Sequence, residues 1–388
     1  MYSAFARCFA TAVLSAGLTA PVAADDIALP PTVAWSAYPT GTSGYSQAVA
    51  IGSVLQNEYA VNLRVVPGRN DIARLAPLRS GHVQFAAGGS EAVYAQEGML
   101  NFGVADWGPT AIRGVVWNIS DGCSFTFGTG ADAGIVEPAD MQGKRLTYVK
   151  GAPSLNNASR ALLAYAELTW DDVEIVEVGG YSASIQAVVE GRADAAGGSC
   201  NSASFLQVEA SPRGLRFVTF PSDDAQAVKR VTDILPWYLP HVATEGPMID
   251  PAEGIEVFTS PYPYLVSMAD ADADLVYNMV KAIAERFEDY RDAAPGAQGW
   301  AMDRQRFEAA FVPYHEGAVR YYKERGLWTE AAEARQQQNL TRQNLLLQAW
   351  ANYTADAPAD ADAFAEGWMK KRAAVLNDAG ITVIAERW

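Results

Sequence analysis

Serine, threonine and glycine residues gather in short loops where predicted strands lead into predicted helices. The first of these loops is YPTGTSGYSQ at residues 38–47, which follows an apolar run at residues 33–38. A strand, a turn of small residues and a helix start can bind a phosphate, support a catalytic nucleophile or bind a carboxylate. The rest of the sequence has to decide among these three chemistries.

Phosphate chemistry and metal chemistry have little support in the sequence. The motifs GxxxxGK[ST] and GxGxxG are absent, and GTGADAG at residues 128–134 has one residue too many and no clear strand before it. His82, His241 and His315 lie far apart, without the paired spacing of metal ligands. We therefore expect neither a cofactor nor a metal.

Nucleophilic catalysis would need a serine or cysteine with a supporting base. Ser90, Ser199 and Cys200 lie in suitable loops, but the GxSxG elbow is absent. His82 is predicted at a strand start and His315 inside a helix, and both positions are more often structural. An exported hydrolase that uses Ser90 or Cys200 is the alternative function.

Carboxylate binding needs backbone N–H groups, hydroxyl groups and helix N-termini directed at one point, with an arginine as an additional partner. Loops of this kind precede predicted helices at residues 40–45, 68–70, 88–90, 152–157 and 197–199. One such loop alone is an ordinary helix cap. Several together favour a ligand-binding cleft.

Short β-like runs alternate with helix-like segments along most of the chain, which predicts α/β layers around a largely parallel sheet. The predicted strands cover residues 33–38, 63–66, 83–87, 113–118, 145–149, 173–178, 193–197 and 215–219. From residue 270 onward the apolar spacing is helical, and the last segment, residues 329–388, is polar and helical.

Two stretches of the chain share one layout. Residues 70–92 and residues 181–203 each run through a helix, a glycine past the helix end, a strand and a turn that reads AAGGS. This repeat predicts two similar α/β lobes, each with a small-residue loop at the carboxyl edge of its sheet. Open α/β sheets bind their ligands at that edge.

The N-terminus has the pattern of a secretory signal peptide over residues 1–24. Arg7 precedes an apolar stretch, and small residues stand at the −3 and −1 positions before Asp25. The remaining residues are numerous enough for two domains, and we expect an exported protein. A net charge of −16 at pH 7 argues against nucleic acid and anionic membranes as partners.

Cys123 and Cys200 remain after removal of the signal peptide. In an oxidising compartment they could form a disulfide, and they could equally be two small buried residues. Both interpretations stay open, because pairing depends on a geometry that the sequence does not show.

Five motifs follow one another in a specific order. They are TGTSGY at residues 40–45, LRSGHVQFA at 78–86, DMQGKRLTYVKGAP at 140–153, VEGRADAAGG at 189–198 and PYHEGAVRYYKERGLW at 313–328. In this order they resemble the TAXI-type substrate-binding proteins of TRAP transporters. The resemblance covers residues 33–328.

The resemblance implies a periplasmic receptor with a two-lobed, type II periplasmic-binding-protein-like α/β fold and a hinge between the lobes. It implies a monomeric, non-enzymatic protein that binds a small carboxylate, such as glutamate or 2-oxoglutarate, and delivers it to a TRAP-type permease. By motif position, the ligand contacts would be Thr42, Ser43, Gly44, Tyr45, Asn70 and Ser90 from the first lobe and Ser154, Asn156, Asn157, Gly198 and Ser199 from the second. Arg69 is the expected charged partner of the ligand carboxylate.

The expected domain boundaries follow from the same comparison. Lobe I covers residues 25–119 and 257–328, lobe II covers residues 120–256, and the second hinge crossing falls at residues 257–268. Residues 329–388 extend past the usual end of the family, and we expect them to pack on lobe I. Asn156, Asn157 and Arg69 replace small residues of the family pattern, and Pro77 interrupts a predicted helix. A ligand-sensing lobe of a signalling system is a further alternative.

Overall fold

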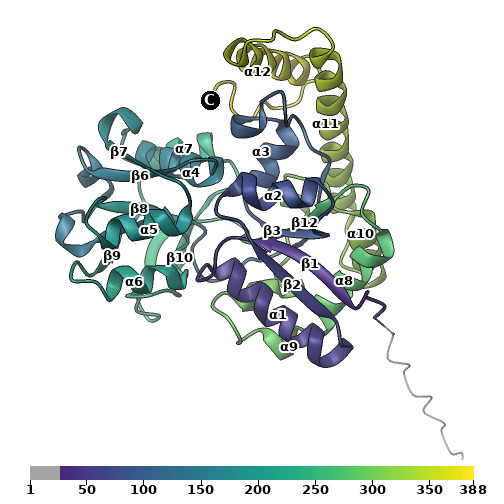
Figure 1. Ribbon diagram of the computed structural model, residues 1–388, viewed down its shortest axis with the longest axis horizontal. Helices are drawn as coiled ribbons and strands as arrows, with labels where there is room; N and C mark the ends of the chain where they lie inside the picture. The colour runs from purple at the N-terminus through teal and green to yellow at the C-terminus, as the bar shows by residue number, and fades with distance from the viewer. Residues whose placement is uncertain (1–26) are drawn as a thin grey trace, which may run out of the picture.

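Two five-stranded sheets form the centres of two lobes, which lie side by side in Figure 1. The computed structural model describes residues 27–388, so the signal peptide predicted at residues 1–24 lies outside the described residues. The chain passes from one lobe to the other and back, through residues 118–125 and residues 260–263. The predicted two-lobed α/β fold is confirmed.

The sheet of lobe I has the strand order β2-β1-β3-β12-β4. Its strands are β1 (Thr32–Ala37), β2 (Asn62–Pro67), β3 (Phe85–Gly88), β4 (Ile112–Trp117) and β12 (Tyr264–Met268). The helices of this lobe are α1 (Ser43–Tyr59), α2 (Asp71–Arg79), α3 (Glu91–Glu97), α8 (Ala273–Glu285), α9 (Phe287–Tyr290) and α10 (Glu316–Glu324). β3 is buried along its whole length, as expected for a central strand covered on both faces.

The sheet of lobe II repeats this arrangement with the order β7-β6-β8-β5-β9. Its strands are β5 (Thr126–Gly130), β6 (Arg145–Val149), β7 (Glu174–Val178), β8 (Ala195–Gly198) and β9 (Leu215–Phe217). The helices are α4 (Pro153–Tyr165), α5 (Tyr181–Val189), α6 (Leu206–Glu209) and α7 (Ala225–Ile234), and an antiparallel ribbon joins β10 (Leu239–Ala243) to β11 (Ile255–Thr259).

The repeat found in the sequence corresponds to equivalent parts of the two lobes. Residues 70–92 form α2 and β3, and residues 181–203 form α5 and β8. β3 and β8 occupy the middle position of their sheets. Both AAGGS turns therefore leave the centre of a sheet at its carboxyl edge, as predicted.

The prediction of a largely parallel sheet was wrong for one side of each lobe. β12 is antiparallel to β3 and β4, and β5 is antiparallel to β8 and β9. β5 was also missed as a strand, because its glycines have a low β-propensity. Gly128 is required there, since a Cβ at that position would lie 2.1 Å from the Phe205 ring.

The two crossings run next to each other between the lobes. Tyr262 N donates to Asn118 O at 2.8 Å, and Phe125 pairs with Phe258 in an isolated β-bridge. The segment predicted as the second crossing, residues 257–268, contains the end of β11, the observed crossing at residues 260–263, and β12. Such paired crossings are the usual place where two lobes bend relative to each other.

The C-terminal residues form two helices, α11 (Glu330–Thr354) and α12 (Ala361–Asp378). Figure 1 shows α11 along the outer edge of lobe I and α12 beside α3. The Glu97 carboxylate, at the end of α3, is fully buried and forms ion pairs with Arg342 and Arg372. The extension is therefore anchored on α3 by a buried charge cluster.

No helix among residues 27–388 is long and apolar enough to cross a membrane.

Candidate ligand-binding site

A small cavity lies between the two lobes, at the carboxyl edges of both sheets. Its volume is about 40 Å³, which is room for about three water molecules. Lobe I contributes Tyr38, Thr42, Ser43, Gly89 and Ser90; the crossings contribute Ser124, Phe125, Ser260, Pro261 and Tyr262; lobe II contributes Ser154, Leu155, Tyr181, Gly198, Ser199, Ser202 and Tyr238. The cavity therefore requires both lobes.

Hydroxyl groups dominate the lining, and among residues 27–388 no Lys, Arg, His, Asp or Glu side chain is part of it. Serine and threonine hydroxyls can donate or accept, so they suit a polar ligand of small size. A charged ligand would have to be stabilised by hydroxyl groups, backbone N–H groups and helix dipoles, because no opposite charge lines the wall.

Several serines and threonines of the lining stand at helix N-termini. Thr42 is the N-cap of α1 and Ser90 that of α3, and Ser154 lies in the first turn of α4. Ser202 caps the short 3₁₀ helix that follows β8. Helix N-termini carry partial positive charge and free N–H groups, so this wall favours an anion.

The predicted contacts fall into two groups. Those that line the cavity are Thr42, Ser43, Ser90, Ser154, Gly198 and Ser199. Those that do not line it are Gly44, Tyr45, Arg69, Asn70, Asn156 and Asn157. Gly44 lies one residue further along α1, where a Cβ would meet Pro263 and Tyr262 at 3.6 Å.

The three asparagines form structural hydrogen bonds instead. Asn70 caps α2 and donates to Lys150 O at 2.8 Å across the cleft. Asn156 exchanges two hydrogen bonds with the backbone of Val149, and Asn157 donates to Tyr94 OH at 2.8 Å. Their amides are used within the protein, so their assignment as ligand contacts is not supported.

The proposed role of Arg69 is not supported either. Its side chain is exposed and lies outside the cavity wall. The backbone oxygen of Arg69 accepts from Tyr181 N at 3.0 Å, which joins the two lobes. Arg69 therefore contributes a backbone contact between the lobes, and its exposed side chain is not part of the cavity wall.

The lobes contact each other directly around the cavity. Ser154 N and Oγ donate to Asp71 Oδ2 at 2.7 and 2.5 Å. Trp237 Nε1 donates to Ser90 Oγ at 2.8 Å, and the rings of Tyr38 and Tyr181 stack with centroids 5.8 Å apart. The structure therefore shows the lobes closed on each other.

A family model described as the NMT1-like family matches the chain over residues 37–326. The chain belongs to the NMT1-like family. The search of curated proteins finds no match.

Solved structures with a similar fold have low sequence identity to this NMT1-like protein. An ancestral arginine-binding protein bound to arginine is 13% identical, with 70% of this chain and 99% of that chain covered and a TM-score of 0.45. The alkanesulfonate-binding protein SsuA from Xanthomonas axonopodis pv. citri, bound to MOPS, is 14% identical, with 78% of this chain and 96% of that chain covered and a TM-score of 0.43. A protein from Bordetella bronchiseptica RB50 is 16% identical, with 92% of this chain and 94% of that chain covered and a TM-score of 0.44.

This NMT1-like protein also has a buried charge cluster behind the cavity that the sequence analysis missed. The Arg74 guanidinium lies 3.3 Å from the Asp71 carboxylate and 2.5 Å from the Glu91 carboxylate, and all three side chains are almost fully buried. It also lies 3.8 Å from the centroid of the Tyr38 ring. Asp71 and Arg74 stand three residues apart on α2, a spacing that favours ion pairs and that could have revealed the pair.

The Tyr38 hydroxyl connects this cluster to the cavity. It donates to Asp71 Oδ1, and burial raises its pKa well above the usual value, so the hydroxyl keeps its proton. Burial likewise raises the pKa of Glu91 to about 7, against the attraction of Arg74 and with the help of Asp71. Tyr262 lies near the same groups.

The raised pKa of Glu91 predicts a pH-dependent stability. Between the ordinary value of 4.5 and about 7, the folded protein binds more protons than the unfolded chain, so its stability falls as pH rises. Between pH 4.5 and pH 7.5, the free energy of unfolding of wild type is expected to fall by on the order of 3 kcal/mol more than that of Glu91→Gln. Urea unfolding of both proteins at several pH values measures this difference.

Two outcomes decide that prediction. The control, Glu174→Gln on the exposed part of β7, is expected to follow wild type. Parallel pH profiles of wild type and Glu91→Gln would show that Glu91 does not titrate in this window.

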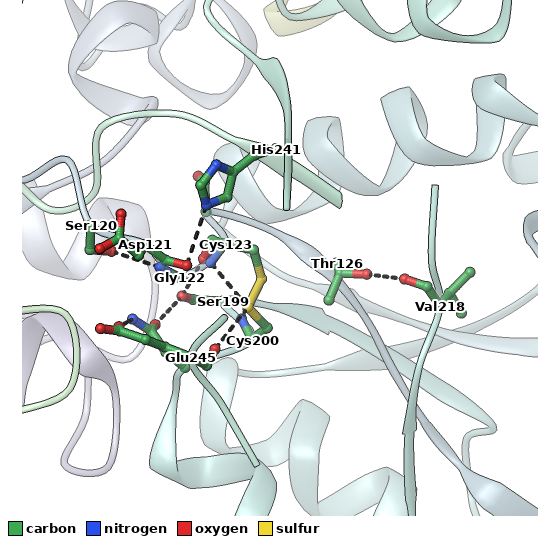
Figure 2. Close-up of a disulfide and its surroundings, with 12 residues drawn as sticks. Ser120, Asp121, Gly122, Cys123, Thr126, Ser199, Cys200, Val218, His241 and Glu245 are labelled. Carbon is green, nitrogen blue, oxygen red and sulfur yellow. Dashed lines mark hydrogen bonds between the residues drawn. A yellow bond between two sulfur atoms is a disulfide. The ribbon is translucent and has the colours of Figure 1, made fainter. Parts of the chain in front are cut away.

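A disulfide joins Cys123 of the first crossing to Cys200 of the loop after β8, which resolves the alternatives left open by the sequence. Figure 2 shows it directly beside Ser199. The Ser199 hydroxyl lies 2.6 Å from Cys123 O and 2.7 Å from Asn201 Oδ1. The disulfide therefore fixes the loop that brings Ser199 to the cavity.

The same bond removes one nucleophile of the hydrolase alternative, because Cys200 has no free thiol. Ser90 accepts from Trp237, and no histidine among residues 27–388 lines the cavity. His315, predicted inside a helix, is the buried N-cap of α10 and accepts from Gly317 N. Within the same residues, no group of three or more His, Cys, Asp or Glu side chains is placed to hold a metal ion.

Proposed function

We propose that this NMT1-like protein is an exported, periplasmic solute-binding receptor that holds a small carboxylate between its two lobes. The observation that carries the proposal is one cavity, formed by both lobes, that is lined by hydroxyl groups and reached by the N-terminus of α1, whose first turn holds no acidic residue. Such a wall suits an anion. The cavity volume of about 40 Å³ favours an acid with few heavy atoms.

Binding proceeds by closure of the lobes. Thr42, Ser43 and Ser90 contact the ligand from lobe I, and Gly198 and Ser199 contact it from lobe II. A ligand that touches both lobes stabilises only the closed state, so affinity and closure are linked. The adjacent crossings supply the place for the bending motion.

The hydroxyl of Ser43 offers a direct test of the site. Ser43→Ala is expected to weaken binding of the preferred acid about tenfold, because a hydrogen bond to a charged group is worth about 1.5 kcal/mol or more. A thermal-shift screen of acetate, lactate, pyruvate, succinate, glutamate and 2-oxoglutarate identifies that acid. Isothermal titration then gives the affinities of wild type and variant.

The matched control is Ser53→Ala on the same helix. Ser53 is exposed, and its hydroxyl donates to Val49 O at 3.1 Å, so this variant is expected to bind like wild type. Equal affinities of Ser43→Ala and wild type would remove Ser43 from the site. Conversion of a bound acid into a product would contradict the receptor and favour the hydrolase.

Delivery to a TRAP-type permease rests on the motif resemblance. It predicts that uptake of the bound acid stops when the ion gradient across the membrane is collapsed and ATP is kept constant. Uptake that continues without the gradient and stops when ATP is depleted would contradict this partner. Binding without any effect on uptake would favour the ligand-sensing alternative.

A further inference from the structure

Asp71 supplies a carboxylate to lobe II from lobe I. One of its oxygens, Oδ2, accepts from both the backbone N–H and the hydroxyl of Ser154, at 2.7 and 2.5 Å. The other, Oδ1, accepts from Tyr38 OH and from Arg74 at 3.3 Å. A carboxylate has about four acceptor positions, so this one is saturated by donors from two lobes.

This carboxylate occupies the N-terminus of α4. The N-cap residue of that helix, Ala152, provides no side-chain hydrogen bond, and an Asp normally fills this role from within the same helix. Here the acceptor comes from α2 of the opposite lobe. The positive end of α4 is thus already paired with an anion when the lobes are closed.

The surroundings of Asp71 make a second anion at this end unfavourable. The buried charges behind the wall are Asp71, Arg74 and Glu91, two acids and one guanidinium. The tyrosines beside them, Tyr38 and Tyr262, are uncharged donors, since burial raises the pKa of both hydroxyls. A ligand carboxylate brought toward Ser154 would meet the Asp71 carboxylate in a water-poor space, where like charges repel strongly.

The start of α1 has no such anion. Thr42 and Ser43 line the cavity there, and the first turn of α1 contains no acidic residue. This helix end can therefore stabilise one carboxylate, whereas the start of α4 is already paired with Asp71.

We propose that Asp71 makes the cavity selective for acids with a single carboxylate, by occupying the helix end that a second carboxylate would need. This inference rests on the proposed function and narrows its ligand class. Asp71 acts as a specificity-determining residue from behind the cavity wall, through its pairing with the start of α4, while the start of α1 binds the ligand carboxylate.

Isosteric pairs of ligands separate charge from size. Malonate, succinate, glutarate and glutamate are each compared with the corresponding monoamide, malonamate, succinamate, glutaramate and glutamine, by isothermal titration. Wild type is expected to bind the monoamide of the best-fitting pair at least tenfold more tightly than the diacid. In Asp71→Asn, the ratio of monoamide affinity to diacid affinity is expected to fall to about threefold or less.

A control variant and the wild-type comparison keep the test decisive. Asp272→Asn removes a carboxylate that caps α8, with Leu275 N at 2.8 Å from Asp272 Oδ1, and is expected to keep the wild-type ratio of monoamide to diacid affinity. If Asp71→Asn does not fold, the wild-type protein alone still tests the proposal, because equal binding of a diacid and its monoamide would overturn it.

The titrations distinguish failure of the Asp71 role from failure of the receptor function. A wild-type protein that binds a diacid as tightly as its monoamide, or an unchanged ratio in a folded Asp71→Asn, overturns the role of Asp71 and leaves the receptor intact. Absence of binding for every acid, including the simple monocarboxylates, contradicts the proposed function itself.

Discussion

Replacement of Glu97 by glutamine is expected to lower the free energy of unfolding by about 3–5 kcal/mol. The Glu97 carboxylate accepts from Arg342 at 3.0 Å and from Arg372 at 2.5 and 3.0 Å, and no part of it is exposed. Burial alone would raise the pKa of Glu97, but Arg372 and Arg342 outweigh it and lower the pKa. Glutamine would leave two buried guanidinium groups without their anion.

Urea unfolding, followed by far-UV circular dichroism, measures this loss. The control is Glu366→Gln, which breaks the exposed pair with Lys370 on α12 and is expected to cost less than about 1 kcal/mol. If the free energy of unfolding fell by the same small amount in both variants, the cluster at Glu97 would not anchor the C-terminal extension. The result also bears on truncation, because removal of residues 329–388 would deprive Glu97 of both of its partners, Arg342 and Arg372.

Reduction of the disulfide is expected to lower the free energy of unfolding by about 4.5 kcal/mol, the chain-entropy value for a loop of this size. Cys123 and Cys200 are 77 residues apart in sequence, so the bond greatly restricts the unfolded chain. In the folded protein, each of the two backbone N–H groups donates to the sulfur of the other cysteine, at 3.0 and 2.8 Å.

Unfolding of wild type with and without a reducing agent gives this difference. The double variant Cys123→Ala/Cys200→Ala is expected to resemble reduced wild type and to show no response to the reducing agent. A loss below about 1 kcal/mol would contradict the entropic account. Weaker ligand binding after reduction is expected as well, since the bond fixes the loop of Ser199.

Much of the architecture was predictable because it depends on patterns that repeat locally. The alternation of apolar runs identified the strands of both parallel halves, and the duplicated AAGGS turns indicated two similar lobes. β5 and β12 were not predicted as strands, for two different reasons. Glycines weaken the pattern of β5, and β12 lies in a segment that was assigned to the hinge.

The cavity-lining residues that stand at the first residues of a helix could be predicted from the sequence. Thr42, Ser90 and Ser154 were found because small polar residues before a helix expose N–H groups. The sequence did not distinguish a side chain that contacts a ligand from one that caps a helix or joins the lobes, as Asn156 and Arg69 show. That difference depends on tertiary contacts.

The charge cluster was missed for a related reason. Asp71 and Glu91 stand at helix starts, where an acid is usually a solvated cap. In the folded protein both acids are buried and pair with Arg74, and Asp71 also accepts from Ser154 of lobe II. These are tertiary contacts, which the position of an acid at a helix start does not reveal.

Native mass spectrometry of the purified protein is the most direct test of the carboxylate receptor, because it weighs the bound ligand without prior choice of compounds. We expect one bound organic acid of low mass per protein, lost on denaturation and much reduced in Ser43→Ala. This acid is expected to have a single carboxylate and to be recovered unchanged after long incubation. Recovery of a compound without a carboxylate, or of a product formed from the bound acid, would contradict a carboxylate receptor.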